Sequence, residues 1–269
     1  MTTLTAAPSV EASGARPAPA AAVVRDTLIM SKRNLRRIRR TPQLVAAASF
    51  LPISFTLMNR YVFGGSVHIP HQTYVDYLIP AMLVLSPLFG GTTAVAMALD
   101  MTGGMVERFK SLPIARSAVL AGRTVADTAR GAFVVLLVLG VGMFLGFRFH
   151  NGFLPGLAAF GLVVAFSFAV SWQMAWIGMT IKDAQAASSA AFVPILIMTF
   201  TGGGLSPVSS LPGWLQAFAH VQPVSVTITT VRALTQGGPI YHTLWQSLAW
   251  TVGILALFMS LTVRQYRKV

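Results

Sequence analysis

The stretch FHNGFLPGLAAFGLVVAFSFAVSWQMAWIGMTI, residues 149–181, contains no charged side chain over 33 positions. An α-helix needs about 20 residues to cross the roughly 30 Å hydrocarbon core of a bilayer. The stretch is therefore long enough for a membrane-spanning helix. It predicts a chain that is embedded in lipid.

The rest of the chain repeats this pattern. Of its 269 residues, 54% are hydrophobic and 10% are charged, whereas charged residues make up about 25% of an ordinary soluble domain. Five further tracts lack charge, at residues 41–59, 77–99, 131–147, 184–231 and 233–263. We therefore predict an all-α membrane protein with six transmembrane helices, at about residues 41–62, 75–99, 126–147, 155–180, 186–206 and 243–263.

The tract at residues 184–231 is long enough for two helices. Its second half carries Gly202, Gly203, Gly204, Pro207, Pro212, Gly213 and Pro223, which are residues that interrupt helices. We therefore predict one span, followed by a re-entrant outer segment at residues 207–234 before the last span.

The basic residues predict the orientation, because Lys and Arg gather on the cytoplasmic side of membrane proteins. Six spans put both termini on one side. Sixteen of the 20 basic residues then fall on that side: Arg16, Arg25, Lys32, Arg33, Arg36, Arg37, Arg39, Arg40, Arg108, Lys110, Arg116, Arg123, Lys182, Arg264, Arg267 and Lys268. Arg60, Arg148 and Arg232 fall on the other side, with Arg130 at the cytosolic rim of the third span. Both termini are predicted to be cytoplasmic, and the net charge of +13 needs no nucleic-acid partner.

The amino-terminal region divides into two parts. Residues 1–21 have too little apolar bulk to pack and are predicted to be a disordered cytoplasmic tail. In residues 22–40 the apolar residues Val24, Leu28, Leu35 and Ile38 recur near helical spacing among basic residues, which is typical of a helix lying in the headgroup plane. A plain basic anchor that only sets the orientation is the alternative. Residues 22–269 form the predicted transmembrane domain.

Several chemistries are disfavoured by what the sequence lacks. Asp76, Asp100, Asp127 and Asp183 fall near predicted span ends, so no carboxylate is expected in mid-membrane for ion-coupled transport. The chain has no Gly-Lys pair of a phosphate-binding loop and no cysteine. His68 and His71 have the spacing of metal ligands but lack the third ligand that zinc requires, and solvated histidines are the other interpretation. We predict no catalytic residue, metal site or cofactor site in this chain.

One aromatic group stands out inside the predicted fourth span. Trp172, Gln173 and Trp176 present two indole rings and one amide. Polar groups within spans face protein or a cavity, so these residues either line a substrate pathway or pack between helices.

The predicted loop at residues 100–124 carries a recognisable motif. It reads Glu107-Arg108-Phe109-Lys110-Ser111-Leu112-Pro113, followed by Gly122-Arg123-Thr124. This resembles the loop of type-2 ABC exporter permeases, and within them the daunorubicin-resistance DrrB subfamily. A second segment, Leu211-Pro-Gly-Trp-Leu with Gln222-Pro223 after it, is similar to the outer segment of the same family.

The resemblance implies a function and a set of partners. It implies the membrane subunit of an ATP-driven exporter of a hydrophobic drug, antibiotic or lipid in a bacterial plasma membrane. Two ABC ATP-binding subunits would bind ATP and Mg²⁺, beside a second permease copy or a sister permease, all within membrane lipids. The coupling loop would contact the ATPase through Glu107, Arg108, Phe109, Lys110, Ser111, Leu112, Pro113 and Arg116. The alternatives are a permease for a polysaccharide or other glycan, a membrane-embedded enzyme, and a scaffold or channel.

Overall fold

The computed structural model describes residues 42–65, 69, 72–90, 92–102, 116–181, 183–205 and 207–268. Every regular element within these residues is helical, which confirms the predicted all-α fold. The elements are α2 (Pro42–Met58), η1 (Asn59–Phe63), α3 (Tyr74–Leu85), η2 (Leu88–Gly90), α4 (Thr92–Thr102), α6 (Arg116–Phe144), α7 (Phe153–Thr180), α8 (Ala184–Thr201), η3 (Val208–Ser210), α9 (Gly213–Val221), α10 (Pro223–Gln236) and α11 (Tyr241–Lys268). The predicted tail at residues 1–21 and the predicted interfacial helix at residues 22–40 lie outside the described residues.

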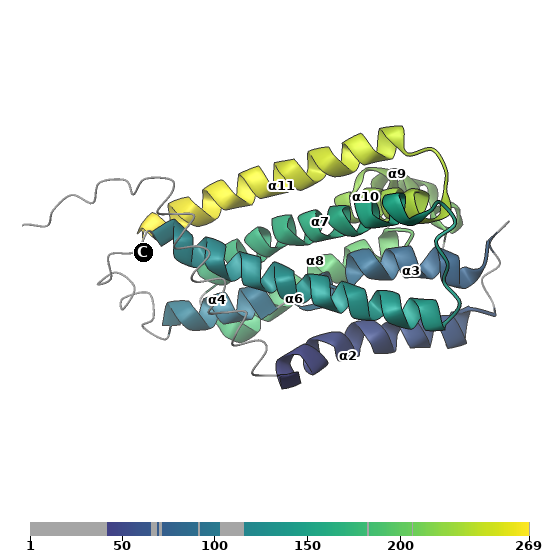
Figure 1. Ribbon diagram of the computed structural model, residues 1–269. Coiled ribbons are helices and arrows are strands. Elements are labelled where there is room, and N and C mark those ends of the chain that lie inside the picture. The colour runs from purple at the N-terminus through teal and green to yellow at the C-terminus, as the bar shows by residue number, and fades with distance from the viewer. Residues whose placement is uncertain are drawn as a thin grey trace, which may run out of the picture.

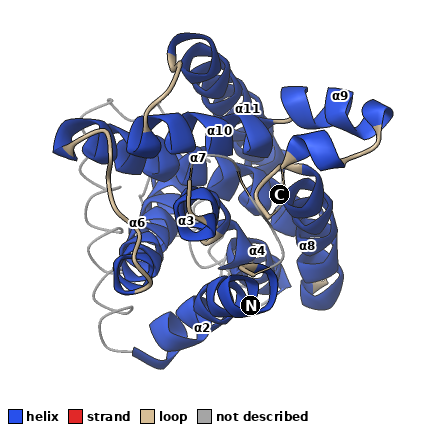
Figure 2. Ribbon diagram, turned by 90° about the vertical axis from the view of Figure 1, so that its right-hand side faces the viewer, coloured by secondary structure: helices blue, strands red, loops and turns tan. Residues whose placement is uncertain are grey.

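The long helices form a bundle with two different ends. Figure 1 shows α2, α6, α7, α8 and α11 running along one direction, with α3 and α4 in line as one broken pass. Helices α9 and α10 lie at one end, which we call the capped end, and Figure 2 looks onto it. The opposite end, where α11 finishes, is called the tail end. Helix α4 finishes and α6 begins at the tail end.

Four of the described helices are long and apolar enough to cross a membrane. By length and composition, these are Ala121–Phe144, Phe153–Thr180, Ala184–Thr201 and Tyr241–Gln265. The other two predicted spans fall on shorter pieces: residues 41–62 on α2 and η1, and residues 75–99 on α3, η2 and α4.

Helix α7 lies at the centre of the bundle and packs against α4, α6, α10 and α11. Of its apolar window 44% is buried, against 17% for α11, so α11 lies at the periphery. Large apolar side chains remain on the surface, with Phe144 95% and Phe153 83% exposed. Such a surface is unfavourable in water and suits contact with lipid.

The second pass is a broken helix. Helix α3 ends at Leu85, and η2 and α4 follow after a turn at Ser86 and Pro87. Proline has no amide hydrogen, so the carbonyl of Leu83 loses the donor that an unbroken helix would supply. The hydroxyl of Ser86 donates to this carbonyl instead, over 3.3 Å. The predicted span at residues 75–99 did not include this break.

The helices on either side of the predicted loop at residues 100–124 are longer than the predicted spans. Helix α4 continues to Thr102 and α6 already begins at Arg116, so helix occupies both ends of the predicted loop at residues 100–124. A helix can continue past the apolar residues of a span into a segment that carries charges, so the charged residues do not mark the helix ends. The residues of this loop that remain, 103–115, lie outside the described part of the chain.

The outer segment at residues 207–234 contains helices where breaks were predicted. Pro212 is the N-cap of α9, and Pro223 is the first residue of α10. Proline fits the start of a helix, because the first amide groups have no partner within the helix. The prolines therefore start helices here, and α10 is largely buried.

Candidate functional site

A small polar cavity lies beside the break in the second pass. It has a volume of about 40 Å³. Its polar lining comes from the break, α4, α6 and α7 and consists of Ser86, Thr93, Asp127, Arg130, Ser167 and Ser171. Because one water occupies about 10–15 Å³ on this measure, the cavity has room for water but not for a drug-sized molecule.

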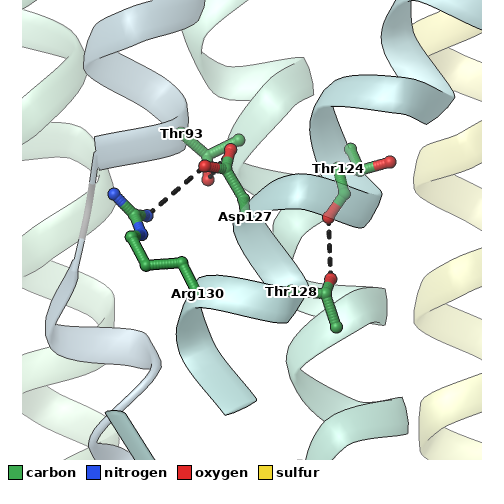
Figure 3. A network of polar contacts seen from close by, with 5 residues as sticks. All are labelled: Thr93, Thr124, Asp127, Thr128 and Arg130. Carbon is green, nitrogen blue, oxygen red and sulfur yellow. Dashed lines mark hydrogen bonds and ion pairs between the residues drawn. The ribbon is translucent and has the colours of Figure 1, made fainter. Parts of the chain in front are cut away.

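Asp127 of α6 is the centre of a polar network at this cavity (Figure 3). The hydroxyl of Thr93 in the first turn of α4 donates to Oδ2 of Asp127 over 2.9 Å. Nη2 of Arg130 lies 3.4 Å from Oδ1 of the same carboxylate. Each carboxylate oxygen therefore has its own partner, one on α4 and one on α6.

The ion pair lies in the first half of α6, within the candidate span Ala121–Phe144. The position of Asp127 and Arg130 at the cytosolic rim of this span stays a prediction. Their side chains are 18% and 16% exposed. Charged residues within a span are costly and are retained where they pair or face a polar cavity, and Asp127 and Arg130 pair with each other and line the cavity.

The carboxylate also lies at the amino-terminal end of α4. Thr92 and Thr93 open that helix, and a helix amino terminus carries a partial positive charge that favours anions. The carboxylate of Asp127, on the neighbouring helix α6, thus places a negative charge beside the partial positive charge at the start of α4.

The backbone of α6 passes close to the break at Gly131. A Cβ atom on this glycine would lie 3.2 Å from Cβ of Pro87 and 3.2 Å from Oγ of Ser167. Even an alanine here would require Pro87 and Ser167 to shift by a few tenths of an ångström. The glycine therefore allows the three elements around the cavity to meet.

The residues predicted for a substrate pathway do not line this cavity. Trp172 is 1% exposed and packs with Met97 of α4 and Met179 of α7. Trp176 contacts Phe258 of α11, with ring centroids 5.6 Å apart, while Gln173 is half-buried. The cavity is lined instead by their neighbours Ser171 and Met174. Packing between helices accounts for both tryptophans, and the pathway role stays a prediction.

The predicted ATPase contacts fall largely outside the described residues. This holds for Glu107, Arg108, Phe109, Lys110, Ser111, Leu112 and Pro113, while Arg116 is described only as the first residue of α6. His68 and His71 also lie outside. Among the described residues, no three His, Cys, Asp or Glu side chains come together in the manner of metal ligands.

A second polar cluster, at the capped end, was not predicted. Nη2 of Arg232 on α10 donates to the carbonyls of Tyr77 and Gly203, over 3.1 and 3.2 Å. Its guanidinium carbon lies 3.6 Å from the centroid of the Tyr77 ring, and the Tyr77 hydroxyl donates to the same Gly203 carbonyl. The arginine thereby ties α10 to α3 and to the turn after α8. The sequence signal for this cluster was Arg232 itself, which is the single charged residue between the uncharged tracts at residues 184–231 and 233–263.

Comparisons with known proteins agree over most of the chain. A profile of the ABC-2 type transporter family matches residues 25–235. The daunorubicin resistance ABC transporter permease protein DrrB1 of Streptomyces coeruleorubidus is 28% identical over 263 residues, which cover 96% of this chain and 92% of that protein.

Two further relatives are similar over shorter lengths. The probable doxorubicin resistance ABC transporter permease protein DrrC of Mycobacterium tuberculosis is 30% identical over 233 residues, covering 86% of this chain and 84% of that protein. The inner membrane transport permease YadH of Escherichia coli is 23% identical over 163 residues, covering 60% of this chain and 62% of that protein.

Proposed function

The chain belongs to the ABC-2 type transporter family, and on this premise we propose that it exports a hydrophobic drug, antibiotic or lipid with ATP hydrolysed by a separate subunit. Membership of the family confirms the resemblance carried by the loop motif at residues 107–113. The observation that carries the proposal is similarity to relatives named as drug-resistance permeases, at 28% and 30% identity over most of both chains.

The proposed topology has six spans with both termini in the cytoplasm of a bacterial cell. Helix α2 and η1 follow one another over residues 42–63, and α3 and α4 together cover residues 74–102. Each of these segments exceeds the roughly 20 residues that a span requires. The sixteen basic residues on one side support the orientation, and the tail end of the bundle would then face the cytoplasm.

The proposed assembly contains two ATP-binding subunits and two permeases. The second permease is another copy of this chain or a sister permease. The partner ATPase would bind ATP and Mg²⁺, because this chain lacks the Gly-Lys of a phosphate-binding loop. The loop between α4 and α6, with Glu107 to Pro113 and Arg116, would contact it at the tail end. Lipid headgroups and acyl chains would surround the exposed apolar side chains.

Copurification with a partner ABC ATP-binding subunit tests the function. We expect a stable complex whose ATP turnover rises when daunorubicin or doxorubicin is added, while the purified permease alone shows no turnover above a detergent blank. A complex that hydrolyses ATP but responds only to glycan substrates would favour the polysaccharide alternative. Turnover by the permease alone, after every other protein has been removed, would contradict the assignment of hydrolysis to a partner.

A further inference from the structure

We propose that Asp127 is a positioning residue for transport, whose hydrogen bond from Thr93 holds α4 in register with α6 and thereby sets the two ends of the loop at residues 103–115. The proposal rests on the proposed function, in which this loop faces the ATPase. We call the contact between Thr93 and Asp127, with Arg130 beside it, the latch (Figure 3).

The break makes the position of α4 independent of α3. All twelve residues of α3 are buried, and the hydroxyl groups of Tyr74 and Tyr77 donate to the carbonyls of Leu205 and Gly203 at the capped end. Helix α4 begins only after the turn and η2. A continuous helix would transmit the position of α3 directly to Thr102, whereas an interrupted one requires other contacts to fix α4.

The two helices that carry the loop share α7 as a neighbour and otherwise pack against different helices. Helix α4 packs mainly on α7 and α8, whereas α6 packs on α2, α3 and α7. Thr93 lies about 14 Å along α4 from Thr102, and Asp127 lies about 17 Å along α6 from Arg116, at about 1.5 Å per residue. The latch joins the two helices at comparable distances from the loop, so it sets how their loop ends are aligned.

If the contact between Thr93 and Asp127 only filled space, a pair of neutral side chains would cost less free energy to bury. The carboxylate of Asp127 and the guanidinium of Arg130, 18% and 16% exposed, carry a cost of burial, and a hydrogen bond to an ionised acceptor is roughly twice as strong as a neutral one. The charged acceptor therefore indicates a contact that must hold α4 firmly in one state.

The cavity allows this contact to open. A buried carboxylate or hydroxyl that loses its partner is strongly unfavourable unless water replaces the partner. The 40 Å³ cavity next to Thr93 and Asp127 has room for a few waters at about 10–15 Å³ each. Both groups can therefore stay hydrogen-bonded when α4 shifts. The cavity is far smaller than the roughly 300–1,000 Å³ of a ligand pocket, so it serves the latch and not the substrate.

Three variants separate the latch from simple packing. Thr93→Val keeps nearly the same shape without the donor, Thr93→Ser keeps the hydroxyl, and Asp127→Asn keeps an acceptor oxygen without the charge. Each is coexpressed with the ATPase, and three quantities are measured: copurification, ATP turnover, and drug transported per ATP hydrolysed.

Because the chain has no cysteine, spin labels can be attached at introduced Met101→Cys and Ser117→Cys, which flank the loop. Pulsed electron paramagnetic resonance then reports the distance between the loop ends without using activity.

We expect Thr93→Val to keep ATPase binding and basal turnover. It should broaden the distribution of distances between the two spin labels and lower the drug transported per ATP by about fivefold or more. Loss of one hydrogen bond shifts an equilibrium between two states by about this factor. Thr93→Ser should restore both readouts, and Asp127→Asn should fall between. Wild-type distances and coupling in both Thr93→Val and Asp127→Asn would overturn the proposal. So would a Thr93→Ser variant that folds but is as impaired as Thr93→Val. If the wild-type complex transports no drug, the proposed function fails, while the distance measurement still tests the latch.

Discussion

Arg232 shows how a single side chain can hold one end of the bundle together. Its guanidinium donates to two carbonyls from different segments and stacks on Tyr77. Lysine keeps the charge but lacks the planar, forked donor and its stacking face. We expect Arg232→Lys to lower the free energy of unfolding by about 1.5–3 kcal/mol, the range for loss of a hydrogen bond to a charged group.

Thermal unfolding of the detergent-purified protein measures this effect. Arg264→Lys, at an exposed position near the end of α11, is the matched control and should leave the Tm unchanged. Equal Tm values for Arg232→Lys and the wild type would contradict the role assigned to the arginine.

At Gly178, helix α7 passes close to α4. A Cβ atom there would collide with the backbone carbonyl of Ala94 and lie 2.8 Å from Cβ of Met97. We expect Gly178→Ala to cost about 1–3 kcal/mol, as overpacking of a core does. Gly161→Ala on the same helix meets no atom within 4 Å and should be neutral or slightly stabilising, because alanine favours helix by about 1 kcal/mol over glycine. Similar Tm values for the two variants would show that the helices separate at no cost.

The sequence placed Asp127 and Arg130 at the cytosolic end of the third span but did not identify the partner of Asp127 on another helix. Arg130 follows Asp127 by three residues and lies 3.4 Å from its carboxylate. Thr93, which donates to the same carboxylate, lies 34 positions earlier in the chain. That arrangement depends on the break at Ser86 and Pro87, which brings the start of α4 beside α6.

At the scale of elements, helices were predicted well and their interruptions were not. Residues 155–180 and 243–263 fall within α7 (Phe153–Thr180) and α11 (Tyr241–Lys268), because long uncharged tracts leave little choice of structure in lipid. Pro87 ends a helix, whereas Pro223 begins one. A proline alone cannot distinguish these cases, since the difference depends on whether the preceding residues are already helical.

The loop between α4 and α6 is the element whose charges should matter for coupling. We expect the double reversal Glu107→Lys with Arg108→Glu to leave membrane insertion intact, because neither residue lies in a predicted span. It should weaken ATPase copurification and abolish efflux, since like charges brought together at an interface cost several kcal/mol.

Membrane level, copurification and drug efflux are measured beside Arg264→Glu with Arg267→Glu, which reverses two charges near the end of α11. Normal ATPase binding together with normal efflux in the loop variant would show that this segment does not couple the subunits.

At the scale of the whole molecule, composition predicted an all-helical protein in lipid but could not decide the number of spans. Length and hydropathy identify four described helices as candidates, and the remaining two predicted spans are short or broken. The basic residues give an independent prediction. A reporter that is active only in the cytoplasm, fused to Val269, should be active, since an even number of spans keeps both termini on the basic side. A well-expressed but inactive fusion would contradict the six-span topology.

The central claim is that this chain moves its substrate only when a separate ATPase supplies the energy. The most direct measurement is drug uptake into inside-out membrane vesicles that contain the chain with its ATPase, the ATPase alone, or the chain alone. The account predicts ATP-dependent uptake of daunorubicin or doxorubicin in the first preparation and none in the other two. Uptake by vesicles that contain only this chain with ATP, or equal uptake with the ATPase alone, would contradict it.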